Sequence, residues 1–239
     1  MSDISVYKDY EKWKNWGENF GELTFNQKRY YDKELNKIEK YLQKKELKVL
    51  EIGFGNGEFL SYGKKKGWNV YGIEINEELV AIGLEHGFNV FSSLDDLAES
   101  SFDLIVAFDV LEHIPACEIT GFVLNIKEIL CKNGFFIARF PNADSPIGLK
   151  YQNGDLTHLN AIGSNKVEQL AKNCEMDIFF MGGQAEILIQ SSIATTLFSF
   201  FVYPIKKTIN IFFKFIYFPT SPYYFSSKNL VFIFRKSIS

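Results

Sequence analysis

Three glycines follow the apolar run Lys48–Ile52 at alternate positions, namely Gly53, Gly55 and Gly57. Glycine allows the backbone to adopt positive φ and to approach a ligand closely. The following segment, 57–66, is compatible with a helix. A strand, a glycine-rich turn and a helix in this order form the unit with which α/β proteins bind nucleotide-like cofactors. This unit therefore predicts an α/β fold with a cofactor site at the glycine turn.

Two carboxylates flank the glycine turn. Glu51 precedes the first glycine, and Glu74 closes the next apolar run about 20 residues further on, where a carboxylate can accept hydrogen bonds from both ribose hydroxyls. Glu58 stands where a pyrophosphate would need the bare N-terminus of the helix, and its charge repels phosphate. These acidic residues favour a cationic nucleoside cofactor over a nicotinamide dinucleotide, which stays the alternative.

A further motif, Asp109-Val110-Leu111-Glu112-His113, follows the apolar run at 102–108. Together with the E-x-G-x-G-x-G sequence and Glu74, it resembles the class I S-adenosylmethionine-dependent methyltransferases over residues 40–180. The resemblance implies S-adenosylmethionine as the cofactor. It also implies cofactor contacts for Glu51, Gly53, Gly55, Gly57, Glu74, Ile75, Ser93, Leu94, Phe108 and Asp109.

Apolar runs alternate with helix-compatible segments through the middle of the chain. We expect strands at 48–52, 69–74, 89–91, 104–108 and 135–139, and helices at 57–66, 76–86, 118–131 and 164–174. This alternation predicts a doubly wound, mostly parallel sheet with its ligand at the carboxyl ends of the strands. By resemblance, the α/β fold is Rossmann-like with seven strands, of which the sixth lies at 185–190 and the antiparallel last strand at 230–234.

The predicted organisation has three parts, which are an N-terminal helical cap over 1–43, a cofactor-binding methyltransferase domain over 44–190 and 228–239, and an insert over 191–227. The insert contains eight Phe and four Tyr. Prolines are expected to break it into pieces too short to span a bilayer, which needs about 20 residues. Its basic amphipathic pattern can pack on the domain, form a homodimer contact or lie on a membrane surface, and all three stay open.

Methylation of a hydroxyl benefits from a positioned base, because the pKa of a hydroxyl lies far above neutrality. Histidine is the side chain best suited to this role near pH 7. Related O-methyltransferases carry a histidine in the loop that holds His158, so we expect His158 to be the base and Asp155 to orient it. The alternative is that His158 caps the following helix or binds the substrate without moving a proton. His113 is a second candidate, with a structural hydrogen bond as the alternative. Asp155 and His158, together with Glu112 or Asp109, do not form a recognisable metal signature, and no metal is predicted.

The segment from Arg139 to His158 resembles bacterial methyltransferases of surface-polysaccharide (O-antigen or capsule) biosynthesis. This resemblance implies a sugar, glycan or sugar-phosphate acceptor. Arg139 could bind a phosphate or carboxylate bidentately, while Asn142 and Asn153 offer amides to sugar hydroxyls. The alternatives are a lipophilic acceptor such as a quinone, and a non-catalytic binding protein that kept the methyltransferase fold.

Net charge and cysteine usage limit the kinds of partner and the cellular compartment that fit this chain. The 239 residues carry a net charge of −3, which gives no overall electrostatic attraction to nucleic acid. The three cysteines have no C-x-x-C spacing, as expected of reduced thiols, and the first residues show no apolar signal segment. We therefore expect a cytoplasmic protein without a nucleic-acid partner, with peripheral contact to the inner membrane surface depending on the insert.

Overall fold

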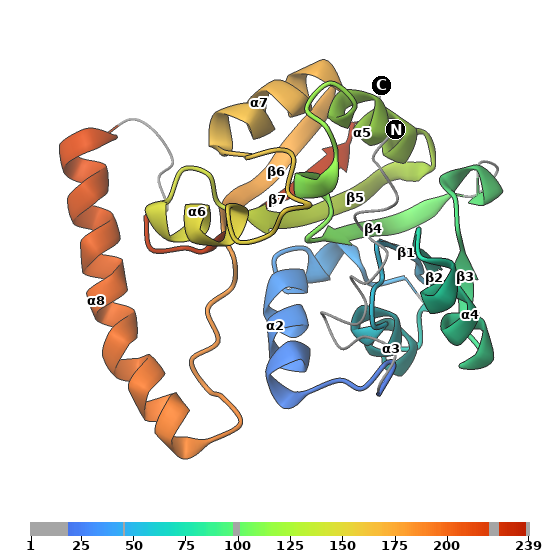
Figure 1. The fold of residues 1–239 in the computed structure, drawn as a ribbon, viewed down its shortest axis with the longest axis horizontal. Helices are drawn as coiled ribbons and strands as arrows, with labels where there is room; N and C mark the ends of the chain where they lie inside the picture. Colours follow the sequence, from blue (N-terminus) through green and yellow to red (C-terminus); the bar gives the residue numbers. More distant parts are fainter. Residues whose placement is uncertain (1–18, 45, 98–100, 220–224, 238–239) are drawn as a thin grey trace.

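A seven-stranded sheet forms the centre of the protein in a computed structural model that describes residues 19–44, 46–97, 101–219 and 225–237 (Figure 1). The strand order is β3-β2-β1-β4-β5-β7-β6, and β7 is antiparallel to both of its neighbours. The strands are β1 (Lys48–Ile52), β2 (Asn69–Ile73), β3 (Asn89–Phe91), β4 (Phe102–Phe108), β5 (Leu130–Pro141), β6 (Met176–Gly183) and β7 (Asn229–Lys236). The predicted fold, mostly parallel with an antiparallel last strand, is confirmed.

Helices cover both faces of this sheet. The α-helices of the described residues are α2 (Phe25–Leu35), α3 (Glu58–Lys65), α4 (Glu77–Glu85), α5 (Ile119–Glu128), α6 (Pro146–Gln152), α7 (Ser164–Asn173) and α8 (Ile193–Tyr217), of which α8 stands apart from the sheet (Figure 1). Successive residues of a strand point to opposite faces. Along β4, Ile105 accordingly packs in the apolar cluster that includes α5 and α7, whereas Val106 packs in the cluster that includes α2 and α3. The order of elements thus places the ends of β1, β2 and β4 at one edge, which we call the carboxyl edge.

The predicted sixth strand was wrong. The sixth strand is β6, and it begins two residues after Cys174, the C-cap of α7. Glu175 adopts a φ of +50° and turns the chain back into the sheet. Residues 185–190 form no strand, and the Ala185 N–H donates instead to Glu34 of α2. The apolar alternation at 185–190 therefore reflects a connecting segment that lies on α2.

The insert also differs from its predicted form. Pro204 lies inside one continuous helix of 25 residues, α8, rather than dividing it. Proline lacks the N–H that would donate to the carbonyl four residues earlier, that of Phe200, and the helix nevertheless continues through Pro204. The helix stands beside the sheet and its covering helices (Figure 1), and none of its residues is buried. Within the described ranges, no helix combines the length and the apolar character that a membrane span requires.

Candidate active site

The glycine turn is built for close approach of a ligand. Gly53, Gly55 and Gly57 have φ values of +68°, +51° and +74°. A Cβ atom on Gly53 would lie 2.6 Å from Val110 Cγ2, and one on Gly57 would lie 2.6 Å from Phe20 Cζ. Both the backbone conformation and the surrounding atoms therefore require glycine at these two positions.

The two predicted carboxylates lie at the carboxyl edge and are buried. Glu51 Oε2 has no hydrogen-bond partner among the described residues, and burial followed by repulsion from Glu58 raises the pKa of Glu51 well above its usual value. Glu74 accepts from the Gly55 N–H at 3.1 Å and from the Asn76 N–H at 3.2 Å. Burial raises the pKa of Glu74 as well. A polar, positively charged ligand would compensate for the burial of both groups.

The remaining predicted cofactor contacts lie around the same edge. Ile75 is 67% exposed directly after Glu74. Ser93 Oγ accepts from the Asp95 N–H at 3.2 Å, and Leu94 begins a short 3-10 helix after β3. Their positions fit a nucleoside that lies between the ends of β2 and β3. The contacts themselves stay predictions.

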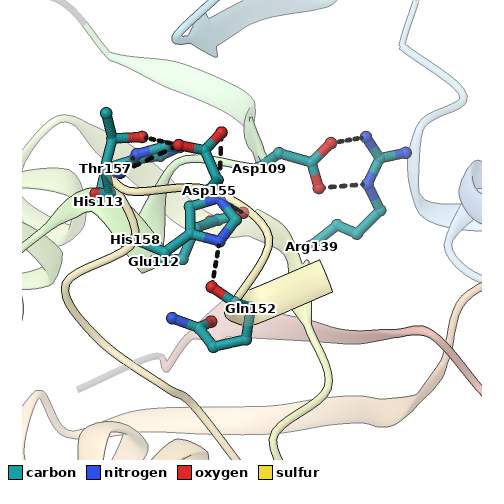
Figure 2. Close-up of polar contacts among 8 residues, drawn as sticks. All are labelled: Asp109, Glu112, His113, Arg139, Gln152, Asp155, Thr157 and His158. Carbon is teal, nitrogen blue, oxygen red and sulfur yellow. Dashed lines mark hydrogen bonds and ion pairs between the residues drawn. The ribbon is translucent and has the colours of Figure 1, made fainter. Parts of the chain in front are cut away.

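Arg139 pairs with Asp109 at this edge. The guanidinium Nε donates to Asp109 Oδ1 at 3.0 Å, and Nη2 donates to Oδ2 (Figure 2). The guanidinium carbon lies 5.0 Å from the Tyr30 ring centroid and 5.1 Å from that of Phe108. Arg139 was predicted to bind an acceptor, but here its bidentate capacity is used by Asp109. An acidic acceptor would have to displace that carboxylate.

Sequence reasoning missed the contribution of α2 to this region. Tyr31 stacks on Phe108 with ring centroids 5.7 Å apart, and Tyr30 meets the same ring edge-on at 6.2 Å. Thr24 and Gln27 form a capping box that begins this helix, and Gln27 Nε2 donates to Glu58 at the glycine turn. The helix therefore packs over the ends of β1 and β4. Residues 1–18 of the predicted cap lie outside the described residues.

Glu112, His113 and His158 form a compact group beside Asp109, which we call the Glu–His cluster (Figure 2). One possible ligand atom from each residue lies within 4.8 Å of the others. The two imidazole rings meet edge-to-face with centroids 4.8 Å apart. His158 Nε2 lies 4.0 Å from Glu112 Oε1 and 4.0 Å from Asp155 Oδ2. Sequence reasoning thus identified His113, Asp155 and His158 but assigned no role to Glu112, although it stands in the same motif as His113.

Backbone contacts hold this cluster together. The N–H groups of Leu159 and Asn160 donate to the Glu112 carbonyl at 2.8 and 3.0 Å, which ties the loop between α6 and α7 to the turn after β4. Asp155 Oδ1 accepts from the Thr157 N–H and Oγ1 at 3.0 and 2.6 Å. The loop is therefore fixed by its own side chains and by Glu112.

Each imidazole has its Nδ1 against a backbone carbonyl. His113 Nδ1 lies 3.1 Å from Thr157 O, and His158 Nδ1 lies 3.1 Å from Gln152 O. Because a carbonyl can only accept, both Nδ1 atoms carry the proton when the rings are neutral, and both Nε2 atoms carry a lone pair. Burial and the neighbouring His158 lower the pKa of His113, which favours its neutral form. The structural hydrogen bond considered for His113 is thus present.

The two predicted amide contacts are in different surroundings. Asn142 is fully buried, donates to Ser227 O at 3.2 Å and accepts from the Asp144 N–H at 3.1 Å. An acceptor could reach Asn142 only if this region rearranged. Asn153 ends α6 and is exposed, so its side chain remains accessible.

The family described as "Methyltransferase domain" matches residues 24–178, which is more than half of the chain. The chain belongs to this family. The prediction of an S-adenosylmethionine-dependent methyltransferase is therefore confirmed at the level of family and fold. Because the glycine turn and both buried carboxylates lie within the matched residues, the confirmed family accounts for the geometry of the cofactor edge.

Solved methyltransferases share this fold. A SAM-dependent methyltransferase from Archaeoglobus fulgidus is 19% identical with a TM-score of 0.61, over 87% of this chain and 94% of that chain. The magnesium protoporphyrin IX methyltransferase from Synechocystis with bound SAH is 16% identical with a TM-score of 0.60, over 98% and 100%. At this level of identity, the likeness concerns the fold alone.

A curated relative matches a shorter region. The ubiquinone biosynthesis O-methyltransferase of Hahella chejuensis is 32% identical over 78 residues, which cover 28% of this chain and 33% of that protein. The chain thus spans about a third of the length of this relative. The match carries no assignment of the acceptor by itself.

Proposed function

We propose that this methyltransferase uses S-adenosylmethionine to methylate a hydroxyl of a lipid-carried glycan in surface-polysaccharide assembly. The observation that carries this proposal is the Glu–His cluster, which joins two imidazoles and a buried carboxylate next to the carboxyl edge. A hydroxyl needs help to lose its proton, whereas a neutral amine already has a free lone pair. A group of proton-accepting side chains at this place therefore fits an oxygen acceptor.

The residues at the carboxyl edge fit the cofactor. S-adenosylmethionine, when bound, supplies a methyl group on a positively charged sulfur. Glu74 offers a buried carboxylate for ribose hydroxyls, and one of its two backbone donors, the Gly55 N–H, belongs to the loop that would cradle the ligand. Glu51 has a buried oxygen without a partner in the described structure, which a cationic ligand would compensate.

His158 is the proposed proton acceptor. Its Nδ1 proton is held by the Gln152 carbonyl, so Nε2 carries the lone pair and faces Asp155 and Glu112 at 4.0 Å. The adjacent carboxylates stabilise the imidazolium that forms when Nε2 takes the proton of the acceptor. In this scheme Asp155 orients His158, and His113 forms the other wall of the cluster.

The proposed acceptor lies at a membrane surface, because α8 exposes its apolar side chains to solvent. Ile193, Leu197, Phe201 and Phe215 are each at least 65% exposed, and they follow one side of the helix. The opposite side contacts the rest of the chain. There, Ser199 and Asn210 hydrogen-bond to Gln190 and Ser226, and Phe213 stacks on Phe225.

Charge on the insert suits an anionic lipid surface. Residues 191–227 contain Lys206, Lys207 and Lys214 and no acidic residue, although the whole chain has a net charge of −3. A helix with a wide apolar face and flanking lysines suits the membrane interface. We therefore propose a cytoplasmic protein that binds the inner membrane surface through α8.

The second candidate is a lipophilic hydroxylated acceptor such as a quinone precursor. The Hahella chejuensis ubiquinone biosynthesis O-methyltransferase favours it, and the same membrane-facing helix would serve it. The two candidates share the hydroxyl chemistry and differ in the acceptor around it.

Transfer of a labelled methyl group from S-adenosylmethionine separates the two candidates. Purified protein on anionic vesicles is offered lipid-linked oligosaccharides, free sugar nucleotides, and hydroxylated polyprenyl phenols in parallel. We expect label in the lipid-linked glycan and a loss of at least a hundredfold in His158→Asn, since general-base catalysis contributes about 10²–10⁴-fold. Label in the phenols alone would replace the glycan proposal with the quinone candidate.

A further inference from the structure

We propose that the Glu–His cluster is a binding site for a divalent transition-metal cation such as Zn²⁺ or Mn²⁺. This inference rests on the proposed function, because it specifies how the cluster would activate an acceptor hydroxyl. It differs from the sequence-based prediction, in which no metal was expected. Its basis is the tertiary arrangement of Glu112, His113 and His158, which the sequence spacing does not reveal.

The distances suit a site that closes on a cation. One ligand atom from each of the three residues lies within 4.8 Å of the others. Ligand atoms at about 2.1 Å from a tetrahedral metal are about 3.4 Å from each other. Side-chain movements of roughly an ångström would therefore complete the coordination, without a change in the backbone.

Hydrogen bonds already orient both imidazoles for metal binding. The carbonyls of Thr157 and Gln152 accept from the Nδ1 atoms of His113 and His158 at 3.1 Å, so Nε2 is the nitrogen that each ring would offer to a metal beside Glu112. Metal-bound histidines usually donate their other ring N–H in this manner, which fixes the tautomer and the ring orientation.

The charge balance of the cluster also calls for a cation. Glu112 is 1% exposed, and its Oε2 has no hydrogen-bond partner in the described part of the chain. Asp155 adds a second carboxylate 4.0 Å from His158 Nε2. The nearby guanidinium of Arg139 donates to both carboxylate oxygens of Asp109. A buried carboxylate is costly unless it is paired or coordinates a metal, and a cation between Glu112 and the two imidazoles would provide that partner.

The donor atoms define the class of cation. Two imidazole nitrogens and a carboxylate suit Zn²⁺, Mn²⁺ and related first-row ions, whereas Mg²⁺ and Ca²⁺ prefer oxygen ligands. Three protein ligands leave a coordination position open for a further oxygen, as in catalytic zinc sites. A hydroxyl bound at that position would lose its proton at a lower pH than in water.

Co²⁺ binding to the metal-free full-length protein tests the inference directly. Titration followed by visible absorption and by calorimetry should show one equivalent bound through nitrogen and oxygen ligands. We expect Glu112→Gln and His158→Asn to weaken binding at least tenfold. The matched control is His86→Asn, which changes a histidine at the end of α4 outside the cluster and should bind Co²⁺ as the wild type does.

The outcomes separate this inference from the proposed function. Binding of S-adenosylmethionine by both cluster variants would show that they are folded. Stoichiometric Co²⁺ binding that depends on Glu112 and His158 supports the metal site even when no acceptor is methylated. Absence of stoichiometric binding, or binding unchanged in both variants, would overturn it. Methyl transfer that persists in a chelator and disappears in His158→Asn would leave the base mechanism and remove the metal.

Discussion

Replacement of two exposed phenylalanines on α8 should release the protein from membranes without destabilising it. Phe201 and Phe215 are 70% and 80% exposed and lie on the side of the helix away from the body of the protein. Full burial of a phenylalanine side chain contributes about 1.5–3 kcal/mol. Burying these two exposed portions in an interface therefore contributes about 3 kcal/mol together. The double variant Phe201→Ser/Phe215→Ser should thus partition to vesicles about 100-fold more weakly.

The assay is flotation with vesicles that contain anionic lipid, over a range of lipid concentrations. Lys207 and Lys214 border the apolar side, and a cation near such a surface contributes about 1 kcal/mol, so added salt should weaken binding. The thermal midpoint of the double variant should match that of the wild type, because neither phenylalanine is buried in the chain.

Phe213→Ser provides the matched control on the same helix. Phe213 faces the body and stacks on Phe225 with centroids 4.1 Å apart. This change should loosen the attachment of α8 while leaving partitioning within a few-fold. Unchanged flotation of the Phe201/Phe215 variant would refute the reasoning. So would a wild-type dimer that the same variant converts to a monomer, since that result would assign the apolar side to a second copy.

Three further predictions concern the cofactor edge. Gly53→Ala should lower the free energy of unfolding by about 2–4 kcal/mol in denaturant titration, because Gly53 has a positive φ and its added Cβ would clash with Val110. The control is Gly87→Ala, which has a similar φ of +69° but no atom within 4 Å of the added Cβ, and it should lower the free energy of unfolding by only about 1 kcal/mol. Glu74→Gln should weaken S-adenosylmethionine binding about 10–100-fold by calorimetry, because it removes charge-assisted hydrogen bonds, while equal affinity would exclude a ribose contact. Because the pKa of Glu51 is raised, part of the free protein carries a proton on this carboxylate, and a cationic ligand would displace it. The affinity for S-adenosylmethionine should therefore increase as the pH rises through that pKa, and Glu51→Gln should remove this dependence.

The parallel strands β1, β2 and β4 could be predicted because each is short, apolar and followed by a glycine or a carboxylate, namely Gly53, Glu74 and Asp109. The edge strand β6 could not, because it lacks such a pattern. Asp177 and Ile178 are both exposed, and a register irregularity precedes Phe180. Residues 185–190 have the better strand sequence, but α2 takes up their backbone donor at Ala185. The choice between the two segments depended on tertiary contacts.

The site was predictable where its parts belong to one motif and unpredictable where they meet across the fold. The glycine turn and the turn after β4 are local in sequence. In contrast, Glu112 and His158 come together because the loop after α6 donates two N–H groups to the Glu112 carbonyl. Asp109 and Arg139 pair because Phe108 and Arg139 are register partners at the ends of β4 and β5. Neither pairing leaves a signal in the spacing of the residues.

Transfer of a ¹³C-labelled methyl group to extracted lipids tests the central claim most directly. The measurement resolves by mass and NMR which atom carries the label, in the wild type, in His158→Asn and in His86→Asn. Our account predicts a methyl ether on a lipid-linked glycan in the wild type and in His86→Asn, and a loss of at least a hundredfold in His158→Asn. A label on nitrogen or carbon, or equal transfer by His158→Asn, would contradict it.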